Sequence, residues 1–232
     1  MSTLLMRLAA PLQAWGTRSR FVYRHTEIAP TKSGVIGMLA AARGLRRTDP
    51  LTELLGLDFG VRIDQPGQRI RDFQVARTLD GSDSMPLSFR YYLADAAFLA
   101  AVCGPRDLLD SLAAALNRPH FPVYLGRRSC PPAGHLNLGV HDGDLTAHLR
   151  TWPWQASPHH QRRHHAPTVR LEILRDARPD ETITEPSHDE PLSFDPAHRQ
   201  HAWRRVVRLH TDITNPRAKP LQDHDPMEVL EG

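Results

Sequence analysis

The segment YYLADAAFLAAVCGPRDLLDSLAAAL, residues 91–116, places two kinds of hydrophobic pattern next to each other. Its first part, Tyr91–Val102, is an apolar run with the length of a buried strand. Pro105 suits the first position of a helix, and the apolar residues after it recur at helical spacing: Leu108, Leu109, Leu112, Ala115 and Leu116. Pro119 ends this pattern. The segment therefore predicts a strand followed directly by an amphipathic helix.

A second strand and helix are predicted near the N-terminus. Thr3–Leu8 is a short apolar run bounded by Pro11, which is typical of an opening strand. Ser33 stands where it can cap a helix, because the apolar residues that follow it share one helical face: Val35, Ile36, Leu39 and Ala40. Arginines at positions 43, 46 and 47 would interact favourably with the C-terminal end of the helix dipole.

Between these two pairs the sequence predicts a hairpin and a projecting loop. Leu51–Leu55 indicates a short helical turn, and Phe59–Ile63 and Arg69–Arg77 alternate like two strands joined by residues 64–67. Leu79–Ser88 lacks periodicity and is rich in Gly, Ser, Asp and Pro, so we expect a loop there. The order strand, helix, strand, strand, helix, strand is that of an α+β, ferredoxin-like (RRM-like) domain, with a four-stranded antiparallel sheet and two helices on one face.

The C-terminal part has a different composition. Fourteen of the twenty prolines lie at or after Pro119, which disfavours long helices and favours short strands. Thr168–Leu174 and Arg205–Thr211 alternate well enough to be strands. We therefore expect a ferredoxin-like domain over residues 1–130 and a smaller β-rich, Pro-rich part over residues 131–232. The acidic tail of this part, residues 221–232, is either a flexible end or a protein contact.

Charge is distributed unevenly between the two parts. Residues 1–130 contain 17 Lys+Arg and 11 Asp+Glu, whereas residues 131–232 contain 12 and 15. The resulting net charges of +6 and −3 predict a basic working face on the N-terminal part. Two cysteines and no recognisable secretion signal favour a reduced, cytoplasmic protein. The longest uncharged apolar run, Ala96–Gly104, is shorter than the roughly 20 residues of a membrane-spanning helix, so we expect no membrane contact.

The basic surplus is concentrated in PLQAWGTRSRFVYRHTEIAPTKSGVIG, residues 11–37. Four cations lie within fifteen residues, and Phe21 and Tyr23 stand among them: Arg18, Arg20, Arg24 and Lys32. This combination suits single-stranded nucleic acid, because cations bind the backbone and rings stack on bases. A solvated charged face is the simpler alternative. Trp15, which precedes the cations, is more often a core or interface residue than a stacking one in such a position.

The start of the predicted helix adds one possible phosphate contact. Lys32 and Ser33 can bind a single anion there together with exposed backbone N–H groups, and Ser33 can act as an ordinary cap at the same time. An ATP-binding loop is excluded, because the required upstream glycine is missing and the lysine follows a threonine.

A second basic element is YLGRRSCPP, residues 124–132. The glycine before Arg127 and Arg128 lets the backbone approach a phosphate while two guanidinium groups reach around it. Structural ion pairs would account for the two arginines equally well. Cys130 has no second cysteine at metal-ligand spacing, so we interpret it as a small buried side chain.

Fourteen histidines raise the question of a metal site, above all in PHHQRRHH, residues 158–165. No carboxylate or cysteine completes a zinc set nearby, and two arginines would repel a dication, so we predict no metal site. We expect a mobile surface loop that contacts RNA or a partner. For metal-independent RNA cleavage, Tyr23, His25 and Lys32 are suitable residue types close in sequence, although any RNA-binding loop would contain such residues.

Several motifs, in the same order, resemble one known family. They are LLMRLAAPLQAWG at residues 4–16, PTKSGVIGMLAAARG at 30–44, YLADAAFLAAV at 92–102 and YLGRRSCPP at 124–132. By these motifs the chain resembles the CasD family, the crRNA 5′-handle-binding subunits of type I-E CRISPR Cascade in the repeat-associated RNA-binding superfamily. The resemblance covers about the first 140 residues and extends more loosely beyond them.

The resemblance implies an RNA-recognition-like domain with a thumb near residues 79–89 that grips the crRNA 5′ handle. It implies two protein neighbours, the Cascade backbone subunit and the large PAM-reading subunit, and contact with target DNA only through the complex. Because a separate subunit cleaves the precursor in this type, it implies no catalytic residue, cofactor or metal. In the type I-C relative the equivalent subunit is an endoribonuclease with a Tyr, Lys and His set. Tyr23, His25 and Lys32 are therefore the alternative catalytic residues.

Residues from the two basic elements and Arg77 make up the predicted RNA site. One wall would consist of Gln13, Trp15, Arg18, Arg20, Arg24, Lys32 and Ser33. The other would consist of Arg127, Arg128 and Ser129.

Overall fold

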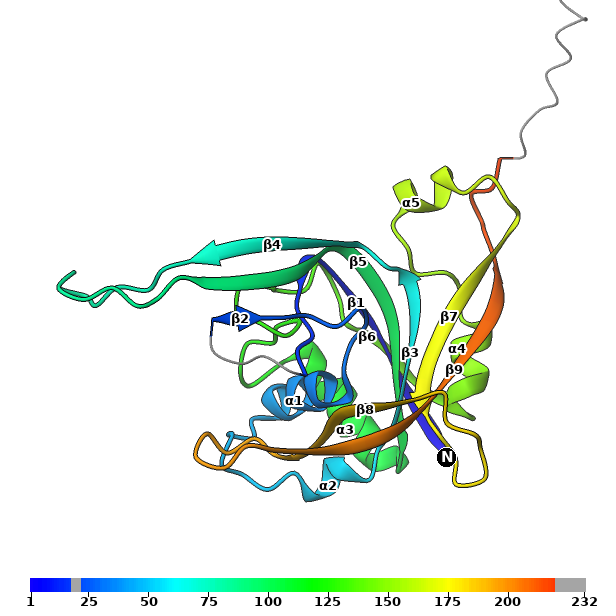
Figure 1. The fold of residues 1–232 in the computed structure, drawn as a ribbon. Helices are drawn as coiled ribbons and strands as arrows, with labels where there is room; N and C mark the ends of the chain where they lie inside the picture. Colours follow the sequence, from blue (N-terminus) through cyan, green and yellow to red (C-terminus); the bar gives the residue numbers. More distant parts are fainter. Residues whose placement is uncertain (18–21, 220–232) are drawn as a thin grey trace, which may run out of the picture.

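The computed structural model describes residues 1–17 and 22–219, whose strands join in one sheet. The strands are β1 (Ser2–Gln13), β2 (Tyr23–Arg24), β3 (Asp58–Gln65), β4 (Gln68–Gln74), β5 (Ser88–Gly104), β6 (Asn137–Asp142), β7 (Thr168–Asp176), β8 (Glu185–Ser193) and β9 (Gln200–Thr214). The helices are α1 (Lys32–Arg43), α2 (Thr52–Leu55), α3 (Arg106–Asn117), α4 (Leu145–Thr151) and α5 (Pro158–Arg163). The strands follow the order β6-β1-β5-β3-β7-β9-β8, and β2 and β4 both pair with β5 (Figure 1).

The strand predicted at residues 91–102 is confirmed as β5, which is longer than predicted and organises the sheet. On one side β5 pairs antiparallel with β1, from Gln13↔Leu93 to Ser2↔Gly104. On its other side, the first half of β5 pairs with β4 and the second half with β3. A single apolar strand therefore aligns most of the N-terminal part, and burial of its second half stabilises that alignment.

β3 and β4 exist, but the hairpin predicted between them is wrong. They pair with successive halves of β5 instead of with each other, and residues 64–67 carry the chain from one half to the next. Gly67 has a φ of +72°, and a Cβ atom there would lie 2.6 Å from the carbonyl oxygen of Ala94. The Gln65 side chain donates a 2.6 Å hydrogen bond to the carbonyl oxygen of Asp95 and secures this crossing.

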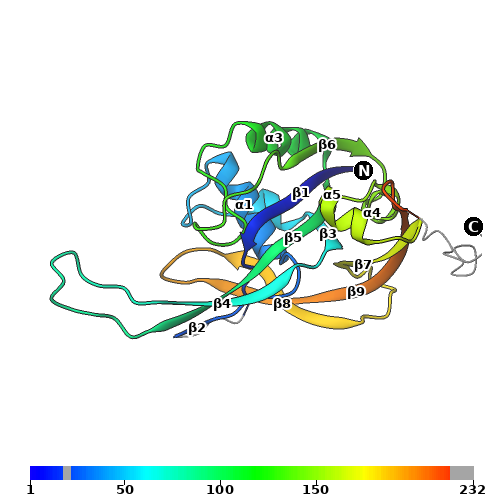
Figure 2. The same ribbon diagram turned by 90° about the horizontal axis from the view of Figure 1, so that it is seen from above.

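β4 and the first half of β5 form a long hairpin, residues 68–94, which we call the arm. The arm projects well away from the rest of the protein (Figures 1 and 2). Its ladder runs from Gln68↔Ala94 to Gln74↔Ser88, and the isolated bridge Arg77↔Ser84 lies beyond the ladder. The loop predicted at residues 79–88 is the tip of this arm. The expected thumb segment is thus only the end of a longer element.

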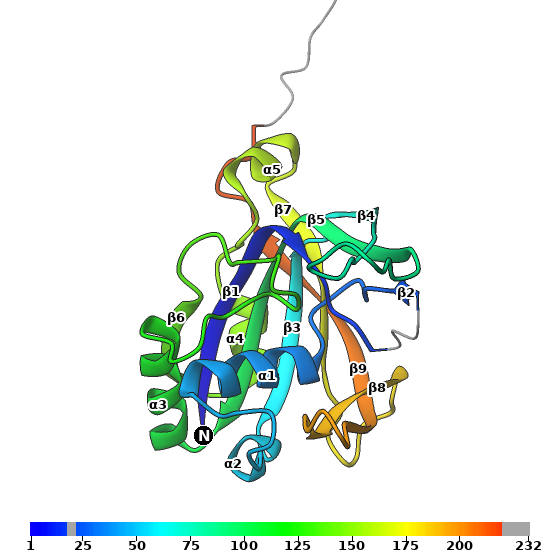
Figure 3. The ribbon, with the colours of Figure 1, turned by 90° about the vertical axis from the view of Figure 1, so that its left-hand side faces the viewer.

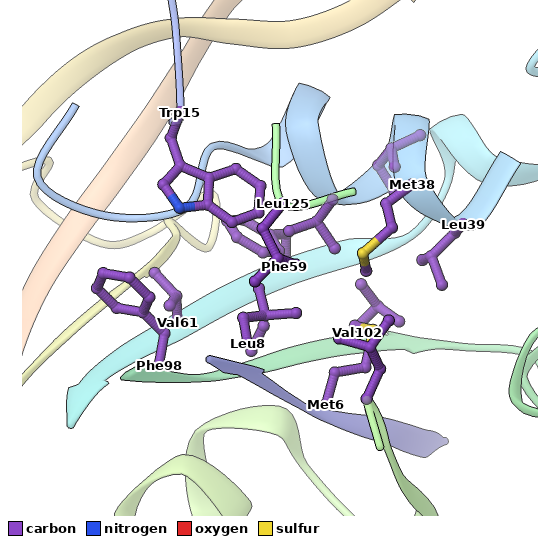
Figure 4. Packing of buried hydrophobic residues seen from close by; sticks show 14 of the residues in the cluster. Met6, Leu8, Trp15, Met38, Leu39, Phe59, Val61, Phe98, Val102 and Leu125 are labelled. Carbon is purple, nitrogen blue, oxygen red and sulfur yellow. The ribbon is translucent and has the colours of Figure 1, made fainter. Parts of the chain in front are cut away.

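The core lies mainly between the sheet and the two predicted helices, α1 and α3 (Figure 3). β1 alternates: Leu4, Met6 and Leu8 belong to the cluster on the α1 and α3 side, whereas Leu5 packs in a second cluster with residues of α4. Figure 4 shows the first cluster from close by, with Met6 and Leu8 of β1 near residues of β3, β5 and α1. The period-two pattern of a strand buried on both faces explains why this run is almost wholly apolar.

The first helix begins two residues earlier than a Ser33 cap would require. Thr31 is the N-cap, and its Oγ1 atom accepts a 3.2 Å hydrogen bond from the backbone nitrogen of Gly34. Ser33 is the second helical residue and is buried. A threonine performs the same capping chemistry as a serine, so the prediction was wrong in position but right in kind.

The C-terminal strands predicted at residues 168–174 and 205–211 are confirmed as parts of β7 and β9. The sheet continues across residue 130, because β6 pairs with β1 and β7 pairs with β3. β8 was not predicted. It contains Pro186 and Pro191 and pairs with β9 through two register shifts, as expected of a proline-containing edge strand. The acidic tail at 221–232 lies outside the described residues.

The His-rich segment forms a short helix instead of the expected mobile loop. Ser157 caps α5, and Asn215 donates hydrogen bonds to the carbonyl oxygens of Gln161 (3.1 Å) and His164 (2.7 Å). The Nε2 atoms of His160 and His164 lie 3.2 Å apart. Burial, and then the nearby His164, lowers the pKa of His160. Within the described residues, no group of three or more His, Cys, Asp or Glu side chains could hold a metal ion.

Candidate nucleic-acid interface

Two adjoining cavities, of about 560 and 750 Å³, lie along one side of α1, where Gly34, Gly37 and Ala41 are half-buried. They share Ser33, Gly34, Gly126 and Arg199, so they form one depression, which we call the α1 groove. Its basic residues are arginines and histidines: Arg24, His25, Arg46, Arg47, Arg127, Arg128, Arg199 and His201. No Asp or Glu lines either cavity, and none of these arginines forms an ion pair with a described carboxylate. A groove of this kind is suited to a polyanion.

The two basic elements meet in this groove because the residue 126 turn packs directly on the end of β1. Gly126 has a φ of +94°, and a Cβ atom there would lie 1.6 Å from the carbonyl oxygen of Ala14. The backbone nitrogen of Ala14 also donates a 3.1 Å hydrogen bond to the carbonyl oxygen of Leu125. Only glycine fits this approach, so the glycine of the Gly-Arg-Arg sequence has a structural purpose.

Arg127 then ties the turn to the other basic element. Its guanidinium group donates hydrogen bonds to the carbonyl oxygens of Tyr91 (3.0 Å) and Arg24 (2.7 Å) and lies 4.6 Å from the ring centroid of Tyr92. Arg128 and Ser129 are exposed. The neighbouring arginines therefore have different environments: Arg127 is held by the protein, whereas Arg128 is available to a ligand.

Two residues predicted to contact RNA, Gln13 and Trp15, are instead buried side chains, although Trp15 is among the residues that line the α1 groove. Trp15 is 1% exposed, and its indole nitrogen donates to the side-chain oxygen of Gln13, which is 0% exposed. The Gln13 amide also donates to the carbonyl oxygens of Leu8 and Ala96. Gly34 packs on this tryptophan, since a Cβ atom there would lie 2.8 Å from the indole ring. Figure 4 places Trp15 above Leu125 within the core.

Lys32 is also occupied within the protein. Its ammonium group lies 3.1 Å from Asp176 and 2.9 Å from Glu190, and it is 7% exposed. Arg204 lies between Asp176, at 2.7 Å, and Asp189, at 2.9 Å. Burial raises the pKa of Glu190, whereas the pKa of Asp189 is lowered because hydrogen bonds from Arg204 and the Lys32 backbone outweigh its burial. The correction is that Lys32 joins α1 to the C-terminal strands and does not line the groove.

The anion predicted at the start of α1 is a carboxylate of the protein itself. The backbone nitrogen of Lys32 donates a 2.7 Å hydrogen bond to Asp189, and that of Gly34 is capped by Thr31. The helix N-terminus therefore has internal partners, as its dipole favours. Of the predicted pair, only Ser33 lines the groove.

The remaining predicted residues divide between the groove and other places. Arg24, Arg127 and Arg128 line the groove. Arg77 lies on the arm, and Ser129 lies next to the groove residue Arg128. Arg18 and Arg20 lie outside the described residues.

Sequence reasoning missed the contribution of the C-terminal part to this groove. Arg199 enters it from the connection between β8 and β9, and His201 from the start of β9; both strands curve toward α1 (Figure 1). Partial burial and the like charge of Arg47 lower the pKa of Arg199. Burial and Arg199 lower the pKa of His201. The sequence identified Arg46 and Arg47 only as cations near a helix end. Nothing in the sequence around Arg199 indicates that it lines the groove.

The alternative catalytic residues are not brought together as a set. Tyr23 and His25 lie in and beside β2, with ring centroids 6.1 Å apart, and His25 lines the groove. Lys32, the cation of this set, is held by Asp176 and Glu190. Cys103 and Cys130 are both free and buried, and burial raises the pKa of each thiol, so neither is an activated nucleophile.

None of the helices in residues 1–17 and 22–219 is long and apolar enough to cross a membrane. This agrees with the short apolar runs of the sequence.

Comparison with known proteins is consistent with this arrangement. The chain is 34% identical over 162 residues to the CRISPR system Cascade subunit CasD of Escherichia coli (strain K12), covering 60% of this chain and 71% of that protein. A solved structure described as a CRISPR RNA-guided surveillance complex contains a chain with a TM-score of 0.76 and 33% identity, covering 96% of this chain and 95% of that one. A crystal structure of a Cas protein gives a TM-score of 0.69 and 35% identity, covering 94% and 98%.

The family model of CRISPR-associated protein (Cas_Cas5) matches residues 3–207, which include most of the sheet, α1 and the residue 126 turn. The chain therefore belongs to the CRISPR-associated protein (Cas_Cas5) family.

Proposed function

We propose that this protein is a non-catalytic subunit of a type I-E CRISPR Cascade complex that binds and caps the 5′ handle of crRNA. The observation that carries the proposal is the α1 groove, whose six arginines face no carboxylate of the groove lining. Similarity to a Cascade subunit and to a chain of an RNA-guided surveillance complex supports Cascade membership. The groove supplies the cations that phosphate groups require, and it does so from four separate parts of the chain.

The fold arrangement supports an RNA-recognition-like, ferredoxin-type core. The order β6-β1-β5-β3 is antiparallel throughout, and α1 and α3 pack on one face of these strands. On this proposal, the α1 groove grips the handle backbone where α1 meets the turn at residue 126. The complex would work in the cytoplasm without a cofactor, metal or membrane.

The arm is the proposed thumb and the proposed contact with neighbouring subunits. Exposed apolar side chains follow it outward: Phe73, Val75, Leu79, Met85 and Leu87. Exposed apolar groups on an extended hairpin gain free energy when a partner covers them. The partners would be the Cascade backbone subunit and the large PAM-reading subunit, and target DNA would be reached only through the complex.

Salt dependence of RNA binding tests the groove. The complex is purified, the 5′ ends of its RNA are sequenced, and that end is synthesised with a fluorescent label. The double variant Arg128→Ala/Arg199→Ala should bind this RNA more weakly. Its slope of log affinity against log salt should be flatter by about 1.4, because each phosphate contact to a single strand contributes about 0.7. Arg118→Ala, an exposed arginine at the end of α3, is the charge-matched control.

Unchanged affinity and slope in the double variant would remove the groove from the RNA site. The endoribonuclease alternative gives a separate outcome in the same preparation. Site-specific cleavage of labelled repeat RNA in EDTA, lost in His25→Ala, would overturn the non-catalytic assignment.

A further inference from the structure

Four aromatic rings form a nearly parallel set where the arm joins the groove. β2 pairs in parallel with the start of β5, so that Tyr23 lies opposite Phe89. The Tyr23 and Phe89 ring centroids are 5.3 Å apart with an interplanar angle of 14°, and those of His25 and Tyr91 are 5.1 Å apart with an angle of 16°. Tyr23 and His25 are themselves inclined by only 11°. We call these four residues the aromatic stack.

The aromatic stack is accessible to solvent, unlike rings that serve a core. Tyr23 is 47% exposed, and His25 is exposed, whereas Phe89 and Tyr91 are half-buried. Among the described strands, β2 pairs only with β5, so Tyr23 is on an edge strand. The inner rings therefore support the outer ones and fix their tilt. Rings held parallel in this way offer planar faces at little cost in side-chain entropy.

Positive charge surrounds these rings. The guanidinium carbon of Arg71 lies 5.4 Å from the ring centroid of Phe89. Arg24, between the two outer rings in sequence, lines the groove, and so does His25 itself. The aromatic stack is thus continuous with the α1 groove through His25. Stacking faces beside a cationic groove are the combination by which proteins hold single-stranded nucleic acid.

We propose that Tyr23 and His25 form a base-stacking subsite for unpaired nucleobases of single-stranded RNA, whose phosphates occupy the adjoining α1 groove. This inference rests on the proposed function and gives these two residues a binding role in place of a catalytic one. Phe89 and Tyr91 are positioning residues that hold the outer rings from behind. Because every nucleobase has a π face, the subsite holds bases without selecting a particular sequence.

The test separates base stacking from phosphate binding. The probes are a fluorescein-labelled eight-nucleotide oligoadenylate and an abasic ribose-phosphate oligomer of the same length and charge. The purified full chain should bind the oligoadenylate about 5- to 140-fold more tightly for each stacked base. Tyr23→Leu and His25→Leu should each reduce this preference, whereas Tyr23→Phe and His25→Phe should retain it. All four variants should keep the wild-type salt slope, because the phosphate contacts are unchanged.

Two results would overturn the inference, and they are distinguishable. If the wild-type chain binds both probes with equal affinity and a steep salt slope, the aromatic stack takes no base while the groove proposal stands. If it binds neither probe, the groove proposal fails and the stacking proposal fails with it. Circular dichroism of the leucine variants verifies that they fold.

Discussion

The guanidinium group of Arg127 donates a 2.7 Å hydrogen bond to the main-chain carbonyl of Arg24, which lies 103 positions earlier in the chain. This contact joins the turn at residue 126 to β2, and both line the α1 groove. The acceptor is a backbone atom, so the contact leaves the Arg24 side chain in place on the groove wall. Arg127 therefore stabilises the structure of the site, because its guanidinium group is already hydrogen-bonded within the protein.

Replacing the two neighbouring arginines should have opposite consequences. Arg127→Ala should lower the free energy of unfolding by about 1–2 kcal/mol, because it removes two charged hydrogen bonds and the contact with Tyr92. Arg128→Ala should change stability by less than about 0.5 kcal/mol but flatten the salt slope of RNA binding by about 0.7. Urea unfolding and fluorescence anisotropy measure the two effects. Equal destabilisation by both variants would contradict this division.

The glycine of the turn is expected to be irreplaceable because of a contact as well as its backbone conformation. Gly126→Ala would place a Cβ atom 1.6 Å from the Ala14 carbonyl oxygen at a φ of +94°. Gly134→Ala is a matched control, because its φ is +97° and no atom lies within 4 Å. The control should lose about 1–2 kcal/mol from left-handed strain alone. Gly126→Ala should lose clearly more in urea unfolding, and a loss equal to the control would show that the close approach is unimportant.

The cap of α1 can be tested with two hydroxyl residues that are two positions apart. Thr31→Ala should reduce the free energy of unfolding by about 1 kcal/mol, because the Gly34 backbone nitrogen loses its acceptor. Thr31→Ser should retain most of that stability. If Ser33→Ala were the more damaging change in thermal or urea unfolding, the assignment of the cap to Thr31 would be untenable.

Acid should weaken the contact between β7 and the segment that follows it. Hydrogen bonds from Arg175, at 2.5 and 2.7 Å, and from the Arg178 backbone lower the pKa of Glu181 from 4.5 to about 2. A carboxyl whose pKa is lower in the folded state adds stability above its unfolded pKa and loses it as pH falls through the folded pKa. Stability should therefore decline between about pH 4.5 and 2.

Glu181→Gln should show less of this decline when urea unfolding is measured across the same pH window. Because other carboxyl groups also titrate there, the comparison is made in a double-mutant cycle with Arg175→Met. In the Arg175→Met background, Glu181→Gln should alter the pH dependence much less, because only the hydrogen bond from the Arg178 backbone remains. A full effect in that background would mean that Arg175 is not the cause.

Much of the N-terminal fold was predictable because its strands and helices have distinct periodicities. Tyr91–Val102 is an apolar run with the length of a buried strand, and the spacing after Pro105 gives one amphipathic helical face. The pairing of β3 and β4 was not predictable by the same means. Both alternate like hairpin strands, but the length of β5 allows them to pair with its two halves in succession.

For the site, composition identified cations and rings but not which of them are free. Trp15 and Lys32 have the residue types of an RNA contact. Trp15 is nevertheless buried in the core, and Lys32 contacts the carboxylates of Asp176 in β7 and of Asp189 and Glu190 in β8. The burial of Lys32 depends on strands about 150 residues away, and that of Trp15 on its contact with α1, and no local pattern encodes either. Arg199 is the converse case, since its surroundings arise only when the β8–β9 connection reaches α1.

By itself, the sequence determined the element types of the N-terminal part, the basic character of residues 11–37 and the Gly-Arg-Arg turn, because these depend on local periodicity, charge and backbone freedom. The tertiary structure alone decided which cations face the groove, since that depends on where the carboxylates of β7 and β8 lie. Lys32 forms ion pairs with such carboxylates, whereas Arg128 is exposed and forms no ion pair with a described carboxylate. Long-range pairing around β5, and the curvature that carries β8 and β9 to α1, therefore separate the cations held in ion pairs from those that line the groove.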